Sequence, residues 1–168
     1  MRKMNTWGTS SILKITLATL LSVSTFLTLP NVGSALASPI INVTSGARTA
    51  PPPPEPSNHM MVADSKHIYQ AIGAVTPGGG LSAIINTSTT TFKEMKILSV
   101  NYRLERWTGT AWVTYKSESK TASKARSLNA ESDCTVIPGY YYRVISVHTA
   151  NDGTVSETKT HTSNNVLF

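Results

Sequence analysis

The stretch 136-VIPGYYYRV-144 joins a tight turn to the most regular β pattern in the chain. Pro138 presets its own φ and Gly139 accepts a positive φ, so this pair predicts a turn. The residues from Tyr140 to Thr149 are then mainly aromatic and β-branched, which is typical of a strand. The stretch therefore indicates antiparallel β structure.

The same alternation, with a period of two, continues on both sides of this strand from Ser65 to Phe168. Turn signals separate the runs, and 151-NDG-153 is the strongest hairpin signal among them. No stretch has the periodicity of a three-turn amphipathic helix. Seven predicted strands cover residues 67–75, 81–85, 95–107, 111–117, 133–136, 140–149 and 154–162, and residues 119–130 and 166–168 are weaker candidates for an edge strand. This pattern predicts an all-β fold, an antiparallel β-sandwich of 7–8 strands over residues 65–168.

One detail of the opening stretch sharpens this prediction. An apolar residue before Pro-Gly and a tyrosine three residues after the glycine resemble the entry to strand F of fibronectin type III and immunoglobulin-like domains. In such domains a tyrosine corner ties the strand to the preceding connection. The resemblance implies that Tyr142 is the corner tyrosine and that Val144, Ser146 and His148 point inward.

A longer resemblance covers residues 104–168. The combination of YRLERWTGTAWVTYKS, VIPGYYYRVISVH and NDGTVSETKTHTSN is similar to a family of small secreted β-sandwich proteins of the Gram-positive genera Bacillus and Clostridium. That family is defined as a domain of unknown function. The resemblance implies a fold and an extracellular location, but no reaction, cofactor or catalytic residue.

The N-terminal region has the layout of an export signal followed by a spacer. Residues 1–37 combine a basic start, a mostly apolar run from Ile15 to Leu29 and a small-x-small cleavage site at 35-ALA-37, so they are predicted to be a signal peptide. The apolar run is shorter than the roughly 20 residues that a membrane helix needs. Residues 38–64, which include 51-PPPPEP-56, predict a disordered Pro-rich linker, either a spacer or a recognition segment.

Charge and cysteine content restrict the function classes. Fifteen Lys and Arg against nine Asp and Glu give +6, and three of the cations fall in the leader, which leaves +3. That charge is too weak to predict nucleic acid binding, although it suits loose attraction to an anionic cell envelope. Cys134 is the only cysteine, so no internal disulfide can form. It alternates with Val136 and is predicted to be a small buried hydrophobe.

The segment 106-RWTGTAWVTY-115 predicts a hairpin in which Trp107 and Trp112 pair across a four-residue loop. The same register pairs Leu104 with Tyr115. Because Leu104 belongs to the apolar face, both tryptophans are expected on the opposite face, at least partly in solvent. They form either a clasp that closes the hairpin or a platform that stacks on a ligand. Trp107, at the strand end, is expected to be the more exposed of the two.

The run 116-KSESKTASKAR-126 is strongly basic, and Lys116 and Lys120 are its candidate ligand contacts. Such a run either touches a polyanion or protects a sheet edge from aggregation.

Two further pairs have a chemical and a structural interpretation. His148 and His161 are expected on adjacent strands, but no third ligand has a diagnostic spacing, so neither a metal nor another cofactor is predicted. Glu131 and Asp133 share one strand face, as the carboxylates of a glycoside hydrolase would, but solvating acids show the same pattern.

The predicted function is a secreted, monomeric, non-enzymatic interaction module. We expect it to bind an envelope polymer or an extracellular protein through Trp107, Trp112, Lys116 and Lys120. Neither nucleic acid nor, after leader cleavage, a membrane is expected as a partner. The alternative is a small secreted hydrolase that acts on glycans through an unrecognised site. The module is favoured because the polar residues are spread along strand faces and do not converge in one place.

Overall fold

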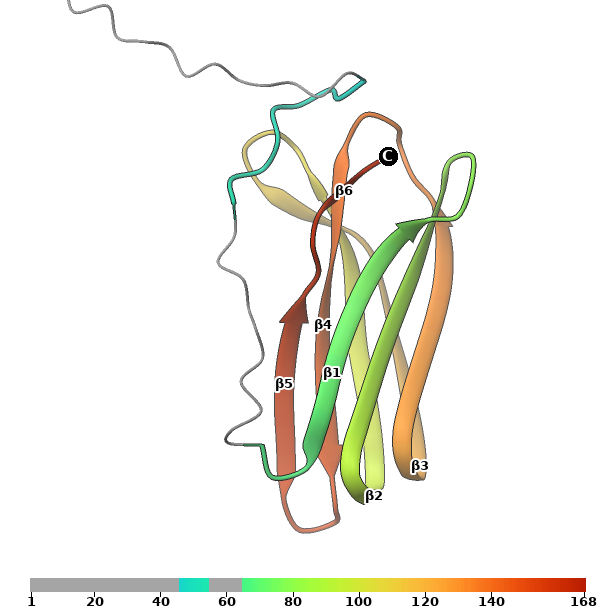
Figure 1. Ribbon diagram of the computed structural model, residues 1–168, viewed down its shortest axis with the longest axis vertical. Coiled ribbons are helices and arrows are strands. Elements are labelled where there is room, and N and C mark those ends of the chain that lie inside the picture. The colour runs from blue at the N-terminus through green and yellow to red at the C-terminus, as the bar shows by residue number, and fades with distance from the viewer. Residues whose placement is uncertain (1–45, 55–64) are drawn as a thin grey trace, which may run out of the picture. The chain divides into compact units, whose positions relative to one another are not determined.

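The computed structural model describes residues 46–54 and 65–168. The predicted leader, and residues 38–45 and 55–64 of the predicted linker, lie outside the described residues. Across the described ranges the chain forms a strongly curled antiparallel sheet of six strands and contains no helix, so the all-β prediction is confirmed (Figure 1). In these same ranges, therefore, no helix is long and apolar enough to span a membrane. The strands are β1 (Ile68–Pro77), β2 (Ser82–Trp107), β3 (Trp112–Thr135), β4 (Tyr141–Asn151), β5 (Ser156–Thr162) and β6 (Val166–Leu167).

Strand β2 is longer than the sequence pattern predicted. The prediction ended a strand at 86-NTSTTT-91, but the structure continues β2 through this segment. Threonine is β-branched and fits a pleated strand, and here Thr87, Thr89 and Thr91 alternate inward and are buried. The polar composition suggested a loop because the sequence does not show which hydroxyls find distant partners. Thr89, for example, bonds to His148.

The two halves of β2 have different neighbours. The first half pairs with β1 on one side and with the second half of β3 on the other. The second half lies between the first half of β3 and β4, whose other edge pairs with β5 and β6. The β2–β3 pairing is interrupted between Thr90 and Met95, where both strands bend. This bend curls the sheet, so that buried side chains from its two parts meet in one core.

Polar and close-packed contacts join the two parts of the sheet at its centre. Thr89 of β2 bonds to the buried His148 of β4 across 2.6 Å, and His148 also bonds to Ser146 across 2.8 Å. β1 approaches β4 so closely that a Cβ at Gly73 would lie 2.7 Å from Oγ of Ser146. Val144, Ser146 and His148 are all buried, as the resemblance implied.

The Tyr142 side chain is fully buried and bonds back to the connection that precedes β4. The backbone N–H of Ile137 donates to the Tyr142 hydroxyl at 3.0 Å, and that hydroxyl donates to the Ile137 carbonyl at 3.3 Å. Gly139, which lies between Ile137 and Tyr142 in the sequence, has a φ of 84°. This angle lies in the left-handed region that glycine favours. The turn and the corner bond predicted from 136-VIPGYYYRV-144 are therefore both present.

Candidate functional site

The loop between β2 and β3 carries the predicted tryptophan pair. Trp107 and Trp112 are cross-strand partners, and their ring centroids lie 5.4 Å apart at an interplanar angle of 54°. The predicted hairpin register is thus confirmed at this position. Together with Glu105 and Arg143, which lie beside them, we refer to these residues as the Trp hairpin surface.

The predicted register is wrong one step further along the hairpin. Leu104 pairs with Lys116 and not with Tyr115, because the register shifts between Leu104 and Glu105. A β-bulge of this kind inserts one unpaired residue and redirects its side chain. The Tyr115 ring thereby meets the Tyr142 ring edge-on at 5.4 Å, next to the tyrosine corner.

The predicted order of exposure of the two tryptophans is also wrong. Trp107 was expected to be the more exposed ring, but it is buried, with 7% of its surface accessible, whereas Trp112 is half-buried. The physical reason is a contact between residues that are distant in the sequence. The Trp107 indole N–H donates to the carbonyl of Ala50 at 3.0 Å.

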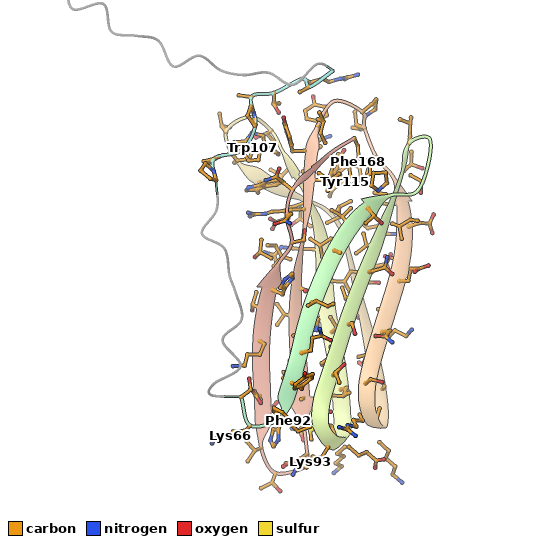
Figure 2. All side chains as sticks on the ribbon, in the orientation of Figure 1. Lys66, Phe92, Lys93, Trp107, Tyr115 and Phe168 are labelled. Carbon is orange, nitrogen blue, oxygen red and sulfur yellow. The ribbon has the colours of Figure 1, made fainter. Side chains whose placement is uncertain are left out.

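Ala50 belongs to residues 46–54, which fall inside the stretch predicted to be a disordered linker. In the structure this segment contacts the folded domain at several points. The backbone N–H of Arg48 donates to the Gly139 carbonyl at 2.6 Å, and the Arg48 guanidinium lies 5.7 Å from the centre of the Tyr140 ring. The Ala50 carbonyl, which accepts the Trp107 bond, is a further contact. Figure 1 shows the segment in cyan beside the β2–β3 loop, and Figure 2 labels Trp107 next to it.

Charged groups support the other ring of the pair. The Arg143 guanidinium lies 4.2 Å from the centre of the Trp112 ring, a cation–π distance. The same guanidinium bonds to Glu105 at 2.9 Å, and Arg103 bonds to the second oxygen of Glu105 at 2.7 Å. Glu105 is only 6% exposed, and a buried carboxylate needs such compensation. These charges therefore hold Trp112 in place.

A second candidate site is a hollow of about 380 Å³ that is lined by β1, β2 and β3. The register aligns the side chains of neighbouring strands, so that Asn86 pairs with Glu131 and Ser88 pairs with Asn129. We refer to this feature as the polar hollow. The side chains that matter most for its chemistry are Ile72, Asn86, Ser88, Lys120, Asn129 and Glu131.

The polar hollow has a mixed and electrically balanced lining. Lys120 and Glu131 contribute one charge of each sign, and the two asparagines add amide donors and acceptors. Ile72 is 44% exposed and supplies an apolar surface. The Thr87 hydroxyl, also in the lining, is buried and has no hydrogen-bond partner among residues 46–54 and 65–168.

The structure separates the two candidate lysines. Lys120 is exposed and lines the polar hollow. Lys116 is half-buried, and its ammonium lies 2.6 Å from Glu118 and donates to the Asp133 carbonyl at 2.7 Å. The Glu118 carboxylate raises the pKa of Lys116. Lys116 therefore stabilises the edge of the sheet and is the weaker candidate for ligand contact.

Each of the two histidines is engaged in its own hydrogen bonds within the fold. His148 is fully buried, and burial lowers the pKa of its imidazole to about 4. His161 accepts a hydrogen bond from the backbone N–H of Gly73 at 3.0 Å, and burial lowers its pKa as well. Among the described residues no three His, Cys, Asp or Glu side chains converge as metal ligands would.

The remaining predicted residues take ordinary places on the sheet. Cys134 is half-buried and packs against the core, and burial raises the pKa of its thiol, so the thiol form predominates. Glu131 and Asp133 are both exposed on one face of β3, but only Glu131 lines the polar hollow. The structure does not bring these two carboxylates together in one pocket.

Most of the polar hollow was missed from the sequence. Asn86 and Ser88 were assigned to a loop, and Asn129 carried no signal of its own. Their common position follows from the pairing of β2 with β3 over more than 40 residues of sequence, as in the Asn86–Glu131 pair. The alternation with a period of two within each strand could have placed these three residues on the outer face of their strands. It could not have shown that the residues of β2 lie opposite those of β3.

Comparisons with known proteins add no assignment to this geometry. No protein-family model matches the chain, and a search of curated proteins finds no similar sequence.

Proposed function

We propose that this chain is an exported, non-enzymatic interaction module whose curled sheet is a sandwich of the fibronectin type III or immunoglobulin-like kind. The bend in β2 and β3 divides the long strands into shorter segments that have different partners. The Tyr142 hydroxyl bonds to Ile137, as a tyrosine corner does. Both observations support this fold assignment.

The observation that carries the function is the polar hollow. It is open to the outside, its two charges cancel, and it combines amides, a hydroxyl and an exposed aliphatic side chain. Such a lining offers many hydrogen bonds to a hydroxyl-rich ligand and no excess charge for a polyanion. We therefore propose that the module binds a glycan segment of the cell envelope through the polar hollow.

The alternative of a glycoside hydrolase has one observation in its favour, because Glu131 lines the polar hollow. A hydrolase of this type uses a pair of carboxyl groups on either side of the scissile bond. Asp133, the second acid of the predicted pair, is not part of the lining. The module is thus the better-supported proposal.

Retention of the full chain on washed Gram-positive cell walls tests the proposal. The Lys120→Ala and Glu131→Gln variants should each lower the bound fraction about tenfold, since the first removes a charged donor and the second replaces a charged acceptor with a neutral amide. Lys96→Ala is the matched control, because Lys96 is exposed, carries the same charge and does not line the polar hollow. Equal retention of all variants would contradict the proposal. Release of reducing sugar that is lost in Glu131→Gln would favour the hydrolase instead.

A further inference from the structure

The contact between residues 46–54 and the Trp hairpin surface has the features of peptide recognition. Four consecutive prolines, Pro51 to Pro54, follow Ala50 directly. Proline fixes φ and restricts the residue before it, so this run favours the extended polyproline II conformation. That conformation has no internal hydrogen bonds, and its carbonyl groups remain free to accept bonds from another surface.

The segment presents one side to the folded domain. Pro52 is buried, whereas Pro51, Pro53 and Pro54 are exposed. With three residues per turn, a polyproline II helix can bury one proline while its neighbours face solvent. The Ala50 carbonyl, two residues before Pro52, accepts the bond from the Trp107 indole.

The receiving surface is aromatic and has one indole N–H donor that is not used. Trp107 uses its indole N–H for Ala50, and the indole N–H of Trp112 is buried without a hydrogen-bond partner among residues 46–54 and 65–168. Aromatic grooves that dock preformed polyproline II segments are a recurring mode of peptide recognition, because the ligand loses little conformational entropy on binding.

The residues before the prolines fix the direction of the segment. Arg48 bonds through its backbone to Gly139 and places its guanidinium near the Tyr140 ring. Thr49 lies against the hairpin loop, where a Cβ at Gly109 would be 3.5 Å from Cγ2 of Thr49. The segment therefore spans from the turn before β4 to the β2–β3 loop, and contacts outside the proline run set its register.

We propose that the Trp hairpin surface is a recognition site for a proline-rich segment in the polyproline II conformation, which the chain's own residues 48–54 occupy. The ligand class is an extended peptide in which a small residue precedes a run of prolines. Because the occupant is tethered, its effective concentration is high, and a free peptide of the same sequence competes poorly with it. The site is separate from the polar hollow, so this inference does not rest on glycan binding.

The first arm of the test measures hydrogen exchange of the Trp107 indole N–H by NMR in the full chain. Pro52→Ser should raise the exchange rate about tenfold, since it weakens the segment that accepts the bond. Pro54→Ser is the matched control, because it also removes one proline but at an exposed position, and it should leave the rate unchanged. Equal rates in the two variants would overturn the proposal.

The second arm adds a synthetic peptide with the sequence of residues 46–56. The peptide should bind the Pro52→Ser variant, and about tenfold more weakly the Pro52→Ser/Trp107→Phe variant, which keeps a ring but lacks the indole donor. A peptide with serine at every proline position should not bind. Faster exchange in Pro52→Ser without peptide binding would overturn the proposal, because the contact would then be packing within one chain. A dimer of the full chain that dissociates on addition of the peptide would support the site, with the segment of a second copy as its occupant.

Discussion

The Trp hairpin surface and the polar hollow differ in what the chain itself does with them. The first is aromatic and is contacted by Ala50 of residues 46–54 at Trp107, which is 7% exposed. The second combines polar and apolar groups and is open, and Lys120 and Glu131 in its lining are both exposed. An aromatic pair is the more conspicuous feature of the sequence, but its apolar area is also what a neighbouring segment gains most by covering. Exposure therefore decides which surface is free for an external ligand.

The largest expected effect is a loss of stability when the Trp hairpin surface is changed. Trp107→Ala removes a buried ring, its aromatic partner and the bond to Ala50, and should lower the free energy of unfolding by about 3 kcal/mol. Trp112→Ala, at the half-buried ring, should cost about 1–2 kcal/mol. Denaturant unfolding of both variants measures which substitution lowers the free energy of unfolding more. A larger loss in Trp112→Ala would restore the prediction made from the sequence.

A fall in pH should destabilise the fold that carries both surfaces, because His148 is buried in the core. The pKa of His148 is about 4 in the folded protein and near its usual value of 6.5 in the unfolded chain, so the unfolded chain binds a proton first as pH falls. Stability is therefore full above about pH 6.5 and should fall by about 3 kcal/mol by pH 4. The lowered pKa of His161 acts in the same direction. Asp152, with a pKa of about 2, contributes a further loss only below its usual value of 3.8.

The measurement is denaturant unfolding at a series of pH values, with the His148 ring signals followed by NMR. A flat stability profile between pH 7 and about pH 4 would contradict the burial of His148 in the neutral form.

A substitution in the turn before β4 should separate the segment from the domain. Gly139→Ala should cost about 1–2 kcal/mol for its left-handed backbone. Its Cβ would also lie 2.6 Å from Cγ of Arg48 and 2.8 Å from the Gly46 carbonyl, so the segment must move. Gly153→Ala is the matched control, because Gly153 also has a positive φ and its new Cβ would meet only the Lys96 side chain. Exchange of the Trp107 indole N–H should become faster in Gly139→Ala alone, and the same acceleration in Gly153→Ala would contradict this contact.

The smallest stability change is expected in the polar hollow. Lys120→Ala removes an exposed side chain, so the free energy of unfolding should change by less than about 0.5 kcal/mol. Thermal melting of the variant, beside its retention on washed cell walls, checks whether binding and stability separate at this surface. A loss above about 1 kcal/mol would mean that Lys120 serves the fold rather than a ligand.

Local chemistry made much of the fold predictable. Pro138, Gly139 and Tyr142 act within a few residues of one another, so the turn and the corner bond follow from the sequence. The Trp107–Trp112 pairing is equally local. In contrast, the bulge next to Leu104, which brings the Tyr115 ring against Tyr142, was not visible in the sequence.

The long-range contacts were the part that sequence reasoning could not supply. The polar hollow depends on the register between distant halves of β2 and β3. The burial of Trp107 depends on Ala50, which is 57 residues away. Composition marked residues 38–64 as a Pro-rich linker but could not identify the surface that Arg48 and Ala50 contact. In physical terms, an alternation of apolar and polar residues with a period of two shows which side chains share one face of a strand. It does not show which strand lies beside it.

The most direct test of this account is an NMR measurement of nuclear Overhauser contacts between the Trp107 ring and residues 46–54 in the full chain. The account predicts contacts from the Trp107 indole proton to Ala50, together with slow exchange of that proton. It also predicts that these contacts weaken in Pro52→Ser and persist in Pro54→Ser. A Trp107 indole that exchanges freely with water and shows no contact to Ala50 would contradict the claim that the chain's own proline-rich segment occupies the Trp hairpin surface.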